Sequence, residues 1–141
     1  MGHNTLLWAR GQETVDSINI SHTNAYLTGH TLPESLRATV ELPALIAHAE
    51  ILLMVVPTPF VAATLSPVLH LLKPHQIIVS CTKGITTDTL ETVDEVLQRI
   101  LPEALTSRLA FLSGPSFATE VASGQAPTCV TIASRDRKSV V

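Results

Sequence analysis

The 141-residue sequence predicts an α/β fold built on a doubly wound parallel sheet, and three observations favour it. Short aliphatic runs alternate along the chain with segments of helical periodicity. The connections between them are short, as in βαβ crossovers. The strongest runs, Ile51–Val56 and Ile77–Ser80, carry no charge, which is typical of strands covered on both faces. A barrel of eight such units would need a longer chain.

Composition narrows the class of protein. Hydrophobic residues make up 45% of the chain and charged residues 15%, which indicates a compact globular protein. The formal net charge of −3 offers no basic surface for a nucleic acid. No apolar run approaches the ~20 residues of a membrane helix, and the first residues show no signal-peptide pattern. We therefore expect a soluble, cytoplasmic protein in which Cys81 and Cys129 are buried free thiols, with no metal site.

The first third of the chain predicts two strand–helix pairs. Val15 and Ile18 give the segment after the first strand a helical spacing. A stretch rich in His, Asn, Thr, Gly and Pro predicts a loop before the second strand. The expected elements are a strand at Thr5–Trp8, a helix at Gln12–Ile20, a loop at Ser21–Pro33, a strand at Leu36–Val40 and a helix at Leu42–His48.

The rest of the chain continues this alternation. Pro57 ends the strongest strand, because proline does not continue a central strand, and Pro67 should kink or split the helix that follows. One face of a later helix collects the apolar residues Leu90, Val93, Val96, Leu97 and Ile100. The expected elements are strands at Ile51–Val56, Ile77–Ser80, Leu109–Leu112 and Thr128–Ala133, helices at Phe60–Leu72, Thr87–Leu101 and Phe117–Ser123, and a helix that begins near Ser134.

Polar and aromatic residues gather where three of these strands end, at Val56–Phe60, Ser80–Gly84 and Ser113–Phe117. The carboxyl ends of parallel strands meet at one edge of a sheet, where ligands bind in such folds. The junctions could line one crevice, with Phe60 against a planar cofactor, Lys83 holding an anion, and helix-start N–H groups holding a phosphate. The alternatives are a solvated lysine, a phenylalanine in the core, and serines that only cap a helix.

One motif of dinucleotide-binding sheets is missing. The glycines are Gly2, Gly11, Gly29, Gly84, Gly114 and Gly124, and none are spaced as G-x-G-x-x-G. That loop normally follows the first strand of the sheet and cradles the pyrophosphate. The sequence therefore predicts a Rossmann-like doubly wound parallel sheet that is incomplete, without its first strand and its glycine-rich loop.

Five motifs then occur in an order that resembles a known family. They are G-H-N-T-L-L-W-A-R, N-A-Y-L-T-G-H-T-L-P, M-V-V-P-T-P-F, S-C-T-K-G-I and L-S-G-P-S-F-A-T-E-V-A. Their succession, from about Gly2 to Ala133, closely resembles NAD(P)-dependent glycerol-3-phosphate dehydrogenase of the bacterial and plastid type. The resemblance implies reversible hydride transfer between NAD or NADP and dihydroxyacetone phosphate, which supplies glycerol 3-phosphate for phospholipid synthesis. It also implies a homodimer at full length, and a plastid location if the source is a plant or an alga.

The resemblance assigns roles residue by residue. Arg10 would lie beside the adenosine ribose, where an arginine would tolerate a 2′-phosphate. Lys83 would face both cofactor and substrate, orient the substrate and stabilise the negative charge that develops on its carbonyl oxygen. The implied cofactor-binding residues are Arg10, Tyr26, Phe60, Lys83 and Ala118, and the implied substrate-binding residues are Lys83, Gly114 and Ser116.

The chain also departs from the family pattern. The amino-terminal strand-loop-helix and the carboxy-terminal helical domain are missing, and the general acid/base lysine of the family would lie beyond Val141. Thr28 and His30 stand where the family usually has proline and an aliphatic residue. We interpret residues 1–141 as a partial NAD(P)-binding domain that binds its cofactor weakly and does not catalyse. An unpaired strand edge should promote self-association.

Two other functions stay open. Another dehydrogenase of the superfamily, acting on a hydroxy acid or a UDP-sugar, would not be expected to carry T-K-G and S-G-P-S-F at these positions. A non-catalytic, truncated interaction module would retain the fold in order to pair with a partner.

Overall fold

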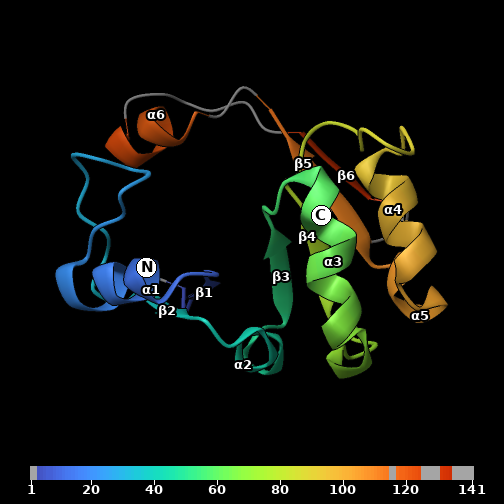
Figure 1. The fold of residues 1–141 in the computed structure, drawn as a ribbon, viewed down its shortest axis with the longest axis horizontal. Coiled ribbons are helices and arrows are strands. Elements are labelled where there is room, and N and C mark those ends of the chain that lie inside the picture. The colour runs from blue at the N-terminus through green and yellow to red at the C-terminus, as the bar shows by residue number, and fades with distance from the viewer. Residues whose placement is uncertain (1–2, 115–116, 125–130, 135–141) are drawn as a thin grey trace. The chain divides into compact units, whose positions relative to one another are not determined.

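The computed structural model describes residues 3–114, 117–124 and 131–134. They divide into two compact units, unit 1 from Met1–Ala49 with Ser116–Thr128 and unit 2 from Glu50–Pro115 with Cys129–Val141. Helices and strands alternate along the chain, and parallel strand pairs occur in both units (Figure 1). The predicted α/β fold with parallel sheets is confirmed.

Unit 1 is built on a two-stranded parallel sheet in which Leu7 lies opposite Ala38. The helix that connects the strands packs Val15 and Ile18 against Ala38, and this packing forms a small core. The predicted strands and helices of this region are confirmed within one or two residues, although the first helix changes to a π-helix after Asp16. The elements are β1 (Leu6–Trp8), α1 (Gln12–Asp16), η1 (Ser17–Ser21), β2 (Arg37–Thr39), α2 (Leu42–His48) and α6 (Ala118–Ser123).

Asn19 protects the outer edge of this small sheet. Its side-chain Nδ2 donates to the Ala38 carbonyl oxygen at 2.9 Å, and its Oδ1 accepts from the Ala38 N–H at 2.8 Å. The amide group thus pairs with β2 as a further strand would. Trp8 Nε1 also donates to the Val40 carbonyl oxygen at 2.9 Å, which fixes the end of β1 to the residue after β2.

Unit 2 is built on a four-stranded sheet of order β3-β4-β5-β6. β3 (Ile51–Met54), β4 (Ile77–Ser80) and β5 (Leu109–Ser113) run parallel, whereas β6 (Thr131–Ser134) is antiparallel to β5. The expectation of a wholly parallel sheet is therefore wrong for the last strand. A parallel return needs a crossover that packs on the same sheet, and the helix before β6, α6, groups with unit 1 instead.

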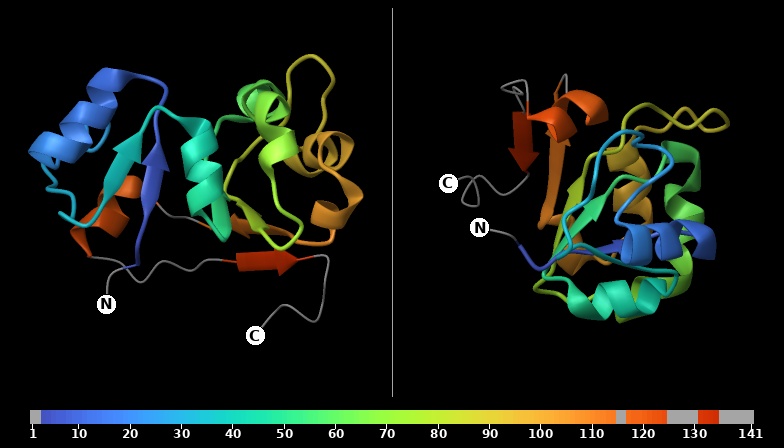
Figure 2. Two further views of the ribbon diagram at one scale, coloured as in Figure 1. Left: turned by 90° about the horizontal axis from the view of Figure 1, so that it is seen from below. Right: turned by 90° about the vertical axis from the view of Figure 1, so that its left-hand side faces the viewer.

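The helices of unit 2 cover one face of this sheet (Figures 1 and 2). Val61 and Leu97, both fully buried, pack there against Met54, Ile78 and Leu109 of the strands. Pro67 divides the first of these helices as predicted, because the α-helix ends at Leu65 and a 3₁₀-helix follows. The helices are η2 (Thr58–Phe60), α3 (Val61–Leu65), η3 (Ser66–Leu71), α4 (Val93–Ile100) and α5 (Glu103–Thr106), of which α5 was not predicted.

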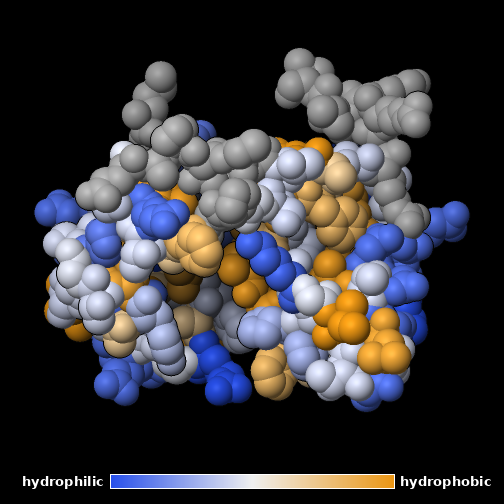
Figure 3. Space-filling view, turned by 90° about the horizontal axis from the view of Figure 1, so that it is seen from above, coloured by the Kyte–Doolittle hydropathy of each residue, from blue (hydrophilic) through white to orange (hydrophobic). Residues whose placement is uncertain are grey.

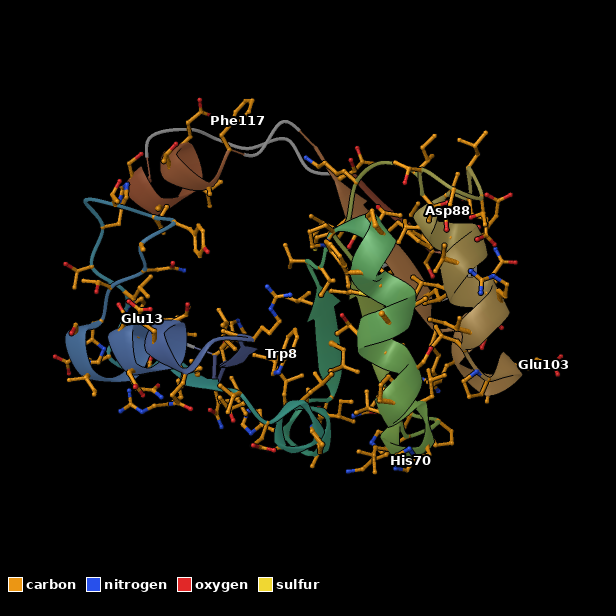
Figure 4. All side chains as sticks on the ribbon, viewed as in Figure 1. Trp8, Glu13, His70, Asp88, Glu103 and Phe117 are labelled. Carbon is orange, nitrogen blue, oxygen red and sulfur yellow. The ribbon has the colours of Figure 1, made fainter. Side chains whose placement is uncertain are left out.

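The prediction of a helix from Thr87 to Leu101 is wrong for its first turn and a half. α4 begins only after Thr92, whose side chain accepts from the Glu95 N–H while the Glu95 carboxylate accepts from the Thr92 N–H, a capping box. Upstream, the Thr86 N–H donates to the Glu91 carbonyl oxygen and closes a loop. Leu90 is 69% exposed at a φ of 56°, and Asp88 lies in the same loop (Figure 4).

The opposite face of the unit 2 sheet is open to solvent. Ile51, Leu53 and Val55 are 57%, 63% and 70% exposed, and Ile77 is 37% exposed. The strands at these positions are confirmed, but the expected burial on both faces is wrong. The described residues supply helices to one face only.

Candidate functional site

The carboxyl ends of β3, β4 and β5 form the candidate site. Because these neighbouring strands are parallel, the segments that follow them leave the same edge of the sheet. Thr58 follows β3, Lys83 follows β4 and Gly114 follows β5. The prediction that the three junctions leave the same edge of the sheet is confirmed, and the third junction is described up to Gly114. Pro115 and Ser116 lie outside the described residues.

Lys83 joins all three junctions. Its Nζ donates to the Gly114 carbonyl oxygen at 3.1 Å, and its own carbonyl oxygen accepts from Thr58 Oγ1 at 2.9 Å. Gly84 follows with a φ of 95°, a left-handed conformation that side chains other than glycine rarely adopt. The lysine is exposed, and hydrogen bonds hold both its carbonyl oxygen and its ammonium group.

Two threonines that the sequence analysis did not select hold this loop in place. Thr82 Oγ1 donates to the Val56 carbonyl oxygen at 2.8 Å, and Thr58 is buried with 3% of its surface exposed. The Cys81 N–H donates to the Met54 carbonyl oxygen at 2.8 Å. Burial raises the pKa of the half-buried, free Cys81 thiol, and Cys129 lies outside the described residues. A hydroxyl residue within the few residues that follow a strand is the signal that could have identified both threonines.

Phe60 lies two residues beyond Thr58, at the end of η2, and is 57% exposed. The alternative that it packs in the core is therefore wrong. Apolar side chains reach the surface among hydrophilic ones on the face that Figure 3 shows. An exposed aromatic ring after β3 and an ammonium group after β4 are groups that suit a ligand that is both planar and anionic.

The other implied cofactor residues belong to unit 1. Arg10 is exposed in the turn between β1 and α1. Tyr26 is 89% exposed in the loop before β2, where its N–H donates to Asn24 Oδ1 at 3.0 Å. Ala118 is exposed as the first residue of α6, next to Phe117, which is labelled in Figure 4. No hydrogen bond joins Arg10 to Tyr26.

The chemistry of the site is that of anion binding. The Lys83 ammonium group has three N–H donors, of which Gly114 takes one, so two can reach an anionic oxygen. In residues 3–114, 117–124 and 131–134, no group of three His, Cys, Asp or Glu side chains could hold a metal ion. Within the same residues, no helix has the length and apolar character needed to cross a membrane.

The donor set fits a dinucleotide in part. Exposed arginine, aromatic and lysine side chains are suitable for a ribose or its phosphate, a planar ring and an anionic group. The loop that would cradle the pyrophosphate is absent from the sequence, because no two glycines have the required spacing.

Comparison with known proteins identifies similar sequences over almost the whole chain. The family model described as NAD-dependent glycerol-3-phosphate dehydrogenase N-terminus matches residues 1–140. The glycerol-3-phosphate dehydrogenase [NAD(P)+] of Nitratidesulfovibrio vulgaris (strain DP4) is 41% identical over 137 residues, 96% of this chain and 41% of that protein. The enzyme of the same name from Syntrophotalea carbinolica is 39% identical over 136 residues, 96% of this chain and 40% of that protein.

Solved structures give the same result. The glycerol-3-phosphate dehydrogenase of Coxiella burnetii superposes with a TM-score of 0.80 at 29% identity, covering 94% of this chain and 40% of that one. The Plasmodium falciparum glycerol-3-phosphate dehydrogenase also gives a TM-score of 0.80, at 27% identity, with coverage of 95% and 38%. The chain thus spans about two fifths of the length of the relatives that it matches.

Proposed function

Because the chain belongs to the NAD-dependent glycerol-3-phosphate dehydrogenase family, we propose that residues 1–141 form part of the NAD(P)-binding domain of an oxidoreductase. This enzyme interconverts sn-glycerol 3-phosphate and dihydroxyacetone phosphate with NAD or NADP and supplies glycerol 3-phosphate for phospholipid synthesis. It works in the cytoplasm, as a homodimer at full length. The single observation that supports the role most is the Lys83 ammonium group, held by Gly114 at the carboxyl edge of β3, β4 and β5.

Lys83 faces both cofactor and substrate in this proposal. It donates one N–H to the Gly114 carbonyl oxygen, and its remaining donors orient the substrate and stabilise negative charge on the substrate's carbonyl oxygen. Nicotinamide, when bound, donates or accepts the hydride. Gly114 and Ser116 lie close to the glycerol 3-phosphate.

Besides Lys83, four residues bind the cofactor in this proposal. Arg10 contacts the adenosine ribose, where its guanidinium group also accommodates the 2′-phosphate of NADP. Tyr26, Phe60 and Ala118 line the cofactor site. The exposure of Arg10, Tyr26 and Phe60 supports these roles, because a ligand can reach all three side chains.

Residues 1–141 alone bind the cofactor weakly and do not turn over substrate. The glycine-rich pyrophosphate cradle is not in the sequence, and the general acid/base lysine of the family would lie beyond Val141. Mixing the purified chain with NADH and dihydroxyacetone phosphate should therefore leave the NADH absorbance unchanged. Steady NADH oxidation that depends on dihydroxyacetone phosphate would show that the chain is an active enzyme.

The experiment that tests the site is a ligand-binding titration with a matched lysine control. Glycerol 3-phosphate and NADH are titrated separately by ligand-observed NMR against the chain and against its Lys83→Ala and Lys73→Ala variants. Lys83→Ala should weaken binding about tenfold to a hundredfold, the range expected for a charge-assisted hydrogen bond. Lys73 is also exposed but precedes β4, whereas Lys83 follows it, so the Lys73 variant should bind as the parent does. Equal affinities of the two variants would contradict the proposed role of Lys83.

A further inference from the structure

Two hydroxyl groups that donate in opposite directions join the loop of Lys83 to the segment after β3. Thr82 Oγ1, from the loop after β4, donates to the Val56 carbonyl oxygen at 2.8 Å. Thr58 Oγ1, from the segment after β3, donates to the Lys83 carbonyl oxygen at 2.9 Å. The backbone is thus held both before and after the side chain whose ammonium group reaches Gly114.

Thr58 is a rigid point from which to hold this loop. It is 3% exposed and lies between Pro57 and Pro59, whose rings fix φ on both sides of it. The Phe60 N–H donates to the Pro57 carbonyl oxygen at 2.9 Å and closes the turn around it. The Thr58 hydroxyl therefore has little freedom to move away from its acceptor.

Gly84 leaves the peptide group after Lys83 free to turn. Its φ is 95°, and glycine moves between this left-handed region and other conformations at little cost. Local backbone preferences therefore do not fix the peptide group between Lys83 and Gly84, whereas the hydrogen bond from Thr58 to its carbonyl oxygen does. Because the Lys83 side chain starts from the Cα atom next to that carbonyl group, its direction depends on the same hydrogen bond.

We propose that Thr58 is a positioning residue for Lys83, whose hydroxyl group keeps the Lys83 ammonium group at the Gly114 carbonyl oxygen, where it binds the anionic part of a ligand. This inference rests on the anion-binding role proposed for Lys83 and extends it to a buried residue. Thr58 acts through Lys83 rather than on the ligand, because its side chain is buried and its hydroxyl proton is donated to the Lys83 carbonyl oxygen. The hydrogen bond from Lys83 Nζ to Gly114, at 3.1 Å, reports whether the ammonium group is in place.

Proton exchange of the Lys83 ammonium group tests the positioning without any ligand. A hydrogen bond slows the exchange of its proton with water, and heteronuclear NMR of the lysine side chains measures the rate, with Lys73 as internal reference. Thr58→Val keeps the shape of the side chain but removes the hydroxyl group. It should speed exchange at Lys83 about fivefold, the factor that corresponds to one hydrogen bond of ordinary strength. Thr58→Ser should keep the parent rate, and an unchanged rate in Thr58→Val would overturn the proposal.

Leu105→Ala is the control that separates positioning from a general loss of stability. Leu105 is 2% exposed on α5, which precedes the amino end of β5, whereas Gly114 follows the carboxyl end of that strand. The variant should lower the melting temperature of the chain at least as much as Thr58→Val does, yet leave proton exchange at Lys83 unchanged. Equally fast exchange in Leu105→Ala and Thr58→Val would overturn the proposal, because stability alone would then explain both. Circular dichroism confirms that each variant is folded.

A double-mutant cycle tests the consequence for ligand binding. Glycerol 3-phosphate is titrated against the parent, Thr58→Val, Lys83→Ala and the double variant. Thr58→Val should weaken binding about fivefold in the parent but not in the Lys83→Ala background, because its effect passes through the Lys83 side chain. Equal weakening in both backgrounds would overturn the proposal. Equal binding by Lys83→Ala and the parent would instead contradict the function proposed for Lys83, and proton exchange would still decide whether Thr58 positions its ammonium group.

Discussion

Unit 1 and unit 2 are stabilised by different means. Unit 1 has a two-stranded sheet and a small core cluster of Val15, Ile18 and Ala38, and the Asn19 amide pairs with the backbone of its edge strand. Unit 2 has a four-stranded sheet and a larger core in which both α3 and α4 pack on one face. The difference indicates that a small sheet relies on directional hydrogen bonds where apolar burial is scarce, whereas a larger one relies on packing.

The largest expected effect is in the core of unit 2. Leu97 is fully buried on α4 among strand and helix residues, so Leu97→Ala should lower the free energy of unfolding by about 2–5 kcal/mol. Urea denaturation measures this loss, and hydrogen exchange should locate it in β3, β4 and β5. Leu90→Ala is the control, because Leu90 is 69% exposed and its truncation should change stability by less than about 0.5 kcal/mol. Equal losses at the two leucines would mean that the predicted helix from Thr87 is formed after all.

The behaviour of Leu90 shows what sequence periodicity can and cannot predict. Val93, Val96 and Leu97 have the predicted helical spacing and are buried, so the helix and its core face are confirmed. Leu90 has the same spacing but lies outside the helix. The capping box at Thr92 and the Thr86–Glu91 hydrogen bonds decide the boundary, and these local bonds are not visible in an apolar pattern.

Only part of the candidate site could be predicted from the sequence, namely the part that depends on strand order. The meeting of the Lys83 and Gly114 segments follows from strand order, because parallel neighbours end at one edge of a sheet. The buried hydroxyl of Thr58 depends on the exact path of the loops, and the antiparallel direction of β6 depends on its pairing with β5, a strand far from it in the sequence. Neither is determined by local spacing. The roles of Arg10, Tyr26 and Ala118 came from the family resemblance alone and stay predictions.

The second prediction tests the pair of hydrogen bonds between the Asn19 amide and the Ala38 backbone in unit 1. Asn19→Ala removes both hydrogen bonds to the Ala38 backbone and should lower stability by about 1–3 kcal/mol, since partly buried backbone groups lose their partners. Hydrogen exchange of β2 should rise with little change in β4. Gln12→Ala is the control, because its side chain bonds only to the exposed Asp16 carboxylate. Equal protection of β2 in the Asn19→Ala variant and the parent would contradict the comparison between the units.

The third prediction concerns the start of α4. Thr92→Ala removes the side-chain oxygen that accepts from the Glu95 N–H and should cost about 0.5–2 kcal/mol. Thr92→Ser should restore most of that loss, because it keeps the hydroxyl. Thr87→Ala, at the residue where the sequence predicted the helix to begin, should have almost no effect in thermal melts. The reverse ranking of Thr87 and Thr92 would place the helix start at the sequence-based position.

The smallest expected effect depends on pH and again distinguishes the units. Unit 2 contains an ion pair in which Arg99 Nε and the Glu91 carboxylate lie 2.9 Å apart. Hydrogen bonds from Arg99, and then from Thr89, lower the pKa of Glu91. A carboxyl with a lowered pKa in the folded state stabilises the fold above its unfolded pKa of about 4.3, and that contribution is lost as the pH falls through the folded value.

Thermal melts from pH 7 to pH 3 measure this contribution. The melting temperature of the parent should be higher than that of Glu91→Gln at neutral pH, and the two melting temperatures should converge in acid. Exchange in the loop before α4 should rise over the same range in the parent, while exchange in β2 stays level, because the Asn19 amide does not titrate. A constant gap between the two melting curves would assign the stabilisation by Glu91 to its neutral hydrogen bonds rather than to its charge.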